Sequence, residues 1–149
     1  MILDARTLIL VADGRRARLF EEARRGGSFT ERPEWIAGLE APHLASTGPR
    51  GSSHDRMGHA SHATAHEAGR SKAEAGFLAL LSKRLETVFV ERAFDHLILI
   101  AAPRALGALR RHLAGGLKAR LELSEPHDRV SANIDDIQQA VRTLRRVNS

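Results

Sequence analysis

Residues 97–109, Leu97-Ile-Leu-Ile-Ala-Ala-Pro-Arg-Ala-Leu-Gly-Ala-Leu109, carry the strongest fold signal of this chain. The run from Leu97 to Ala101 is continuously apolar, which is typical of a strand buried on both faces of a sheet. Pro103 favours the first turn of a helix, because its missing N–H group is not needed there. A buried strand that leads directly into a helix is the repeating unit of α/β folds, so we expect a sheet with helices packed on it.

The first 37 residues predict a three-stranded antiparallel meander. A second apolar run at 8–12 is followed by Asp13-Gly14, a strong signal for a type I′ hairpin. The alternating residues 16–22 are then expected to form the return strand. A further turn leads to a third strand at 29–36, in which Pro33 indicates an edge or a bulge.

The amino-acid composition changes in the middle of the chain. Residues 38–66 are rich in Gly, Ser and His and hold few large apolar side chains, so they predict a long flexible loop inside a single domain spanning 1–149. A helix at 67–92 follows, and its apolar stripe has helical spacing. The stripe consists of Phe77, Leu78, Leu81, Leu85, Val88 and Phe89.

The carboxyl-terminal third predicts two more helices and one more strand. The helix that starts at Pro103 is expected to end at Gly115-Gly116, and a short helical turn and strand are expected within 117–123. Ser131 or Asn133 is expected to cap a last helix. The stripe of that helix is Ile134, Ile137, Val141 and Leu144. The complete order, β-β-β and then α-β-α-β-α, predicts a mixed sheet with helices on its faces, the element order of ribonuclease H-like folds.

The amino-acid composition excludes several classes of function. The chain has 149 residues, no cysteine and a formal net charge of +5. The absence of cysteine excludes disulfides, thiolate nucleophiles and cysteine-ligated metals, and it fits a reducing compartment. No apolar run approaches the roughly 20 residues that span a bilayer, and the first residues do not resemble a signal peptide. We therefore expect a cytoplasmic protein without membrane contact.

The positive charge is concentrated in one segment. Residues 104–121 hold five cations and no acid, while the remaining charges balance. The five are Arg104, Arg110, Arg111, Lys118 and Arg120. Such a segment attracts phosphate groups, unless it is a solvated helix face neutralised by acids from neighbouring elements. It contains no aromatic residue, which argues against base stacking on single strands.

The end of the strand at 97–101 is the favoured position for a ligand. Ligands of open α/β sheets bind beyond the carboxyl ends of parallel strands, where the N-terminus of the next helix offers N–H groups to an anion. Arg104 lies at that start. In the alternative interpretation Pro103 merely begins the helix and Arg104 is solvated.

Several catalytic classes lack their motifs. A two-metal nuclease needs converging carboxylates, but Asp13 follows the end of its strand, and the strand at 97–101 ends without an acid. Only Glu67 and Glu74 on the long helix are suitably positioned. Neither a G-x-S-x-G nucleophile elbow nor a phosphate-binding P-loop occurs.

Histidines give the second candidate site. His59, His62 and His66 are spaced three and four residues apart, so on a helix they would share one face and suit zinc or nickel, with His54 as a further ligand. The alternative is a polar loop with solvated histidines. An enzyme that uses residues 48–66 as a lid, with these histidines as acid–base groups or ligands, is the alternative function.

Two segments resemble a known family. Leu10-Val-Ala-Asp-Gly-Arg-Arg-Ala-Arg-Leu-Phe20 is similar to the opening strand, turn and strand of the bacterial host attachment proteins, and residues 94–110 resemble their second signature. The resemblance implies the fold of the middle domain of archaeal and eukaryotic peptide-chain release factors, which is ribonuclease H-like. It therefore implies a module that binds structured RNA or the ribosome.

The resemblance fails at the catalytic motif. Release factors promote peptidyl-tRNA hydrolysis with a Gly-Gly-Gln loop just before the long helix. Here the corresponding segment, within 48–66, contains no Gly-Gly-Gln, and glutamine occurs only at 138 and 139. We therefore expect no catalytic residue of that type and no cofactor. A surface role, which the family name suggests, would need an export signal that we do not expect.

Overall fold

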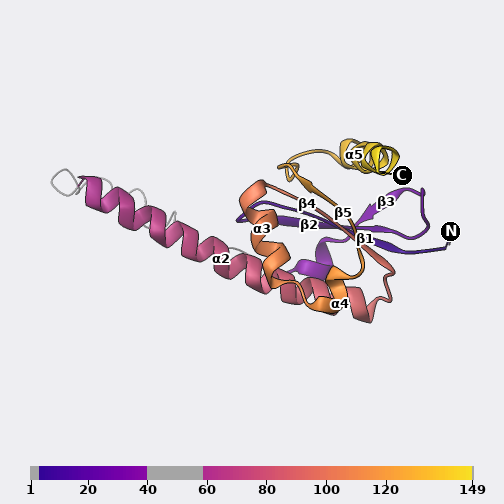
Figure 1. The fold of residues 1–149 in the computed structure, drawn as a ribbon, viewed down its shortest axis with the longest axis horizontal. Coiled ribbons are helices and arrows are strands. Elements are labelled where there is room, and N and C mark those ends of the chain that lie inside the picture. Colours follow the sequence, from indigo (N-terminus) through magenta and orange to yellow (C-terminus); the bar gives the residue numbers. More distant parts are fainter. Residues whose placement is uncertain (1–3, 40–58, 149) are drawn as a thin grey trace.

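The computed structural model describes residues 4–39 and 59–148, with the backbone alone for 59–66. Its centre is a five-stranded mixed sheet with the order β3-β2-β1-β4-β5 (Figure 1). The strands are β1 (Thr7–Ala12), β2 (Ala17–Glu22), β3 (Phe29–Glu31), β4 (His96–Ala101) and β5 (Leu121–Pro126). β1 pairs antiparallel with β2 and parallel with β4, and β5 is parallel to β4. The predicted mixed α/β sheet is thereby confirmed.

Helices cover both faces of the sheet. α2 (His59–Glu91), α3 (Pro103–His112), the short α4 (Gly115–Lys118) and the 3-10 helix η1 (Pro33–Ile36) contribute to one core layer. α5 (Ile134–Val147) covers the opposite face. Along β1, Leu8 and Leu10 belong to the first layer and Ile9 and Val11 to the second. This is why β1 is apolar at every position from Leu8 to Ala12.

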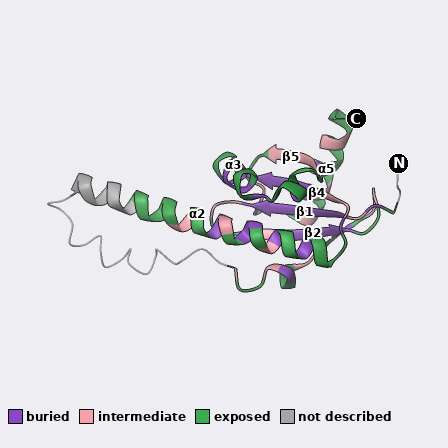
Figure 2. Ribbon diagram, turned by 60° about the horizontal axis from the view of Figure 1, so that its bottom comes forward, coloured by how far each residue is buried: buried purple, intermediate pink, exposed green. Residues whose placement is uncertain are grey.

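α2 divides into a packed part and a projecting part. All six residues of the predicted stripe are buried against the sheet. Towards its amino end the helix extends past the body, and the described side chains there are exposed (Figure 2). α2 begins at His59, eight residues before the predicted start, so residues 59–66 of the predicted loop are helical. The rest of that loop, from 40 to 58, lies outside the described residues.

The predicted type I′ hairpin at Asp13-Gly14 is wrong. Four residues connect Ala12 to Ala17, and Gly14 does not have the positive φ that a type I′ turn requires. Instead the Asp13 side chain organises the loop. Its Oδ1 accepts hydrogen bonds from the amides of Arg15, at 2.8 Å, and Arg16, at 2.6 Å. An aspartate that bonds to the next amides in this way stabilises a turn without left-handed backbone.

Two further boundaries differ from prediction. The third strand ends at Glu31, and Pro33 begins η1 instead of continuing the strand, because proline fits the first turn of a helix. Gly115-Gly116 does not end α3, which already stops at His112. These glycines begin α4, where the Ala114 carbonyl accepts from the amides of Leu117 and Lys118.

The last helix agrees with its prediction from the sequence. Asn133 caps α5, and its Oδ1 accepts a hydrogen bond from the Asp136 amide at 2.8 Å. Ile137 and Val141 are fully buried.

In the part of the chain that the structure describes, no helix is both long enough and apolar enough to cross a bilayer.

Candidate functional site

A cleft opens beyond the carboxyl ends of β1 and β4. The two strands end together, with Ala12 opposite Ala101, and the Ala102 amide donates to the Ala12 carbonyl at 3.3 Å. The cleft has a volume of about 530 Å³ and lies between α2, α3 and the β1–β2 loop. Its polar or loop residues are Gly14, Ser71, Glu74, Arg104 and Arg111. Its position is that predicted for a ligand at the end of the strand at 97–101.

The N-terminus of α3 forms part of the cleft wall. Ala102 and Pro103 line the cleft, and no described side chain hydrogen-bonds to cap the helix at Ala102. The first turn contains no acidic residue. No acid of α3 itself therefore compensates the partial positive charge of this helix end, and Glu74 of α2 is the carboxylate that lines the same cleft.

Of the five predicted cations, Arg104 and Arg111 line this cleft. They lie seven residues apart, which is two helical turns, so α3 presents both on one face. Arg110 is exposed on the same helix but does not line the cleft. The structure therefore brings two of the five together.

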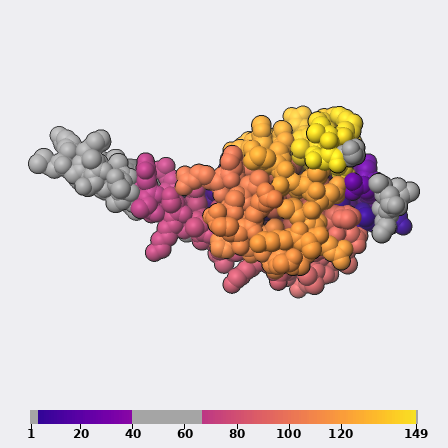
Figure 3. Space-filling view, in the orientation of Figure 1, coloured from indigo at the N-terminus to yellow at the C-terminus, as the bar shows by residue number. Residues whose placement is uncertain are grey.

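Lys118 and Arg120 lie at the other end of the sheet. The Arg120 carbonyl accepts from the amide of Leu97, at the start of β4, whereas Arg104 follows the end of that strand. Six residues of strand separate these ends by about 20 Å. Figure 3 shows the orange segment that contains the five cations spread over one face of the body. The basic segment is thus not one compact patch.

The five cations also differ from seven other arginines of the described residues. No carboxylate among the described residues forms an ion pair with any of the five, and each is exposed. Seven other arginines do form ion pairs: Arg6, Arg16, Arg18, Arg25, Arg32, Arg129 and Arg145. The alternative interpretation, neutralisation by acids of neighbouring elements, therefore has no ion pair to support it in residues 4–39 and 67–148, although Glu74 lines the same cleft as Arg104 and Arg111.

Glu74 faces the cleft from α2. A Cβ atom on Gly14 would lie only 2.6 Å from Glu74 Oε1, so the carboxylate touches the backbone of the β1–β2 loop. Within the described residues it forms no ion pair with Arg104 or Arg111, although all three line the same cleft. From the sequence, Glu74 is expected only as a ligand of a two-metal nuclease. The available signal was its spacing from Ser71 and Leu78, which puts the three on one helical face.

The nuclease and metal predictions have different outcomes. The Asp13 carboxylate is engaged in its own loop, β4 ends in alanine, and no group of three His, Asp or Glu converges among the described side chains. The backbone of His59, His62 and His66 belongs to α2, but their side chains and all of His54 lie outside the described residues. Metal binding by these histidines stays a prediction.

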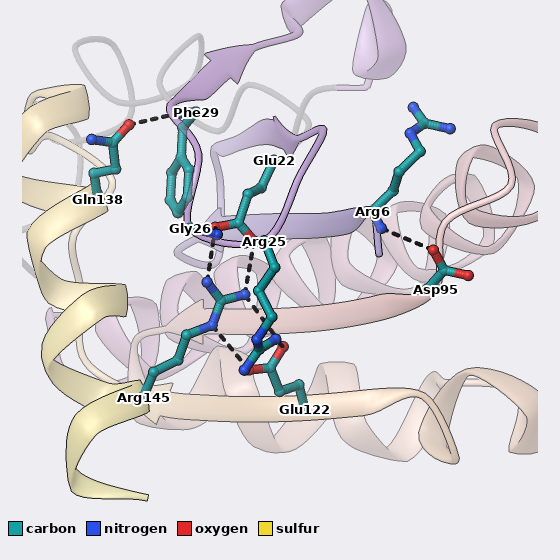
Figure 4. A network of polar contacts seen from close by, with 9 residues as sticks. All are labelled: Arg6, Glu22, Arg25, Gly26, Phe29, Asp95, Glu122, Gln138 and Arg145. Atoms are coloured by element: carbon teal, nitrogen blue, oxygen red, sulfur yellow. Dashed lines mark hydrogen bonds and ion pairs between the residues drawn. The ribbon is translucent and has the colours of Figure 1, made fainter. Parts of the chain in front are cut away.

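A second cluster of charged residues lies at the opposite end of the sheet (Figure 4). Arg145 binds Glu22 and Glu122, and Arg25 binds Glu122 with two hydrogen bonds of 3.1 and 3.0 Å. Burial alone would raise the pKa of Glu122, but the hydrogen bonds and charges of Arg25 and Arg145 hold it below its usual value. Since every member is paired within the cluster, its role is to join β2, β5 and α5.

The comparison with known families agrees with the fold. A family model, bacterial archaeo-eukaryotic release factor family 12, matches residues 6–141. No curated protein matches the chain. The matched region includes both segments that resemble the host attachment proteins, all five strands, and the cleft residues Glu74, Arg104 and Arg111. The chain therefore belongs to the bacterial archaeo-eukaryotic release factor family 12.

Proposed function

We propose that this protein is a non-catalytic module that binds structured RNA or the ribosome. One observation carries the proposal: Arg104 at the uncapped start of α3 and Arg111 in its last turn line one cleft, and neither forms an ion pair with an acid among the described residues. Exposed guanidinium groups bind phosphate oxygens in bidentate fashion. An adjacent helix N-terminus adds backbone donors and a favourable dipole.

Family membership supports a link to translation. The family is named after release factors, which act on the ribosome. The strand order β3-β2-β1-β4-β5, with β2 the only strand antiparallel to β1, supports a ribonuclease H-like topology like that expected for the release-factor middle domain. The lack of Gly-Gly-Gln anywhere in the sequence argues against peptidyl-tRNA hydrolysis. Binding without hydrolysis is the function that remains, and its place in the cell would be the cytoplasm.

Co-sedimentation with purified ribosomes over a range of salt concentrations tests this function. Binding through phosphate contacts should weaken with salt, with a logarithmic slope of about 0.7–0.9 per contact. The triple variant R104E/R110E/R111E should remain in the supernatant. The triple variant R24E/K83E/R142E changes the net charge equally at exposed positions outside the cleft and should still pellet. Equal pelleting of both variants would contradict the proposal.

A further inference from the structure

The cleft combines two opposite charges on facing elements. Glu74 projects from α2, while Arg104 and Arg111 project from α3, and the three do not neutralise one another through an ion pair. A ligand that only carried phosphate would leave the carboxylate unused and would be repelled by it. The complementary ligand has hydrogen-bond donors at one end and an anion at the other.

We propose that this cleft binds a guanosine 5′-phosphate group, with Glu74 receiving the guanine edge and Arg104 and Arg111 holding the phosphate. The inference rests on the proposed function and specifies which nucleotide the site recognises. The volume of about 530 Å³ lies within the range of small-molecule sites.

The chemistry of Glu74 selects the base. An ionised carboxylate only accepts hydrogen bonds. The Watson–Crick edge of guanine offers two adjacent donors, N1–H and the N2 amino group, which match the two carboxylate oxygens. Adenine and cytosine each put an acceptor nitrogen beside their amino group, and uracil has a single N–H between two carbonyls. Guanine is therefore the base that satisfies both oxygens.

The apolar part of the cleft lining suits the flat base. Leu78 from α2 and Ala105 and Ala108 from α3 line the cleft together with the charged groups. Small apolar side chains leave room for a ring and contact its faces without competing for its polar edge. The close approach of Glu74 to Gly14 limits how far the carboxylate can move toward the β1–β2 loop.

The same nucleotide group occurs free and at the 5′ end of an RNA. Calorimetric titration of the purified protein with GMP, IMP and AMP tests the chemistry. IMP lacks only the N2 amino group, and loss of a hydrogen bond to a charged acceptor costs about tenfold or more in affinity. We expect GMP to bind at least tenfold more tightly than IMP or AMP. A short RNA beginning with 5′-phosphorylated guanosine, compared with GMP, then identifies the source: tighter binding of the RNA favours an RNA end, and equal binding favours the free nucleotide.

Variants make the test specific. Glu74→Gln should remove the preference for GMP over AMP, whereas Glu86→Gln, exposed on the same helix, should keep it. R104E/R111E should abolish binding of every nucleotide. Equal affinity for GMP and AMP in the native protein, or a preference that survives Glu74→Gln, would overturn the proposal. Ribosome co-sedimentation of the Glu74→Gln variant separates this inference from the proposed function. The variant should lose its preference for guanine but should still pellet with ribosomes, because the arginines that bind phosphate are unchanged.

Discussion

The guanidinium of Arg145 donates two hydrogen bonds, each 2.8 Å long, to the carboxylate of Glu22. The pair joins α5 to β2, and the Glu22 side chain is only 1% exposed. A carboxylate so deeply buried needs its cation, because removal of one partner leaves an unpaired buried charge. The contact therefore fixes α5 on its face of the sheet.

Replacement of Arg145 should destabilise the fold strongly. We expect Arg145→Ala to lower the free energy of unfolding by about 3–5 kcal/mol, the usual cost of breaking a buried ion pair. Arg142→Ala, an exposed position on the same helix, should change it by less than about 0.5 kcal/mol. Urea unfolding of both variants checks this. Similar midpoints for the two would mean that the pair does not hold α5.

Stability should fall in acid because of Glu122. Its pKa in the folded protein lies below the usual carboxyl value, so its ionised form stabilises the fold at neutral pH. That contribution is present above the unfolded pKa of about 4.3 and is lost as the pH falls through the folded value. Thermal unfolding measured from pH 7 to pH 3 should show that the stability of the fold declines below about pH 4.5. This decline should be smaller in the Glu122→Gln variant. An equally steep decline in that variant would assign the effect to other groups.

Truncation of a side chain on the packed face of α2 should destabilise the fold far more than truncation on its exposed face. Leu85 is fully buried, and Leu85→Ala should cost about 2–5 kcal/mol through lost burial and a cavity. Leu80 is 55% exposed on the same helix, and Leu80→Ala should have a small effect. Guanidinium unfolding of the two variants makes the comparison. A large loss in Leu80→Ala would show that this face is covered in solution.

The histidine prediction is open to direct analysis. A helical backbone brings residues three and four apart onto one face, as metal binding by His59, His62 and His66 requires. Untagged protein should then retain a near-stoichiometric amount of zinc or nickel in elemental analysis, and the triple alanine variant should lose it. Metal-free native protein after exposure to both ions would contradict the prediction.

Local signals predicted most of the fold. The apolar runs of β1 and β4, the stripe of α2 and the Asn133 cap each depend on neighbours in the sequence, so their patterns identified them. The β1–β2 loop was mispredicted, because the side chain of Asp13 overrode the backbone preference of Asp-Gly. The start of α2 was missed, because residues 59–66 are small or polar and contain no apolar stripe at helical spacing.

The candidate site was only partly predictable. Arg104 follows a buried strand directly, so its position at the sheet edge could be inferred from the sequence. Glu74 enters the cleft because α2 packs beside α3, a contact between segments about thirty residues apart that no local pattern encodes. The separation of Arg120 from Arg104 likewise depends on the path of α3 and α4 along the sheet.

The most direct test of the central claim compares the two ends of the basic segment. R104E/R111E and K118E/R120E change the net charge equally, but only the first pair alters the cleft. Ribosome co-sedimentation at low and at moderate salt should show that R104E/R111E no longer pellets, while K118E/R120E pellets with a smaller loss. Equal losses would mean that charge alone drives binding, and a larger loss in K118E/R120E would contradict the assignment of the cleft.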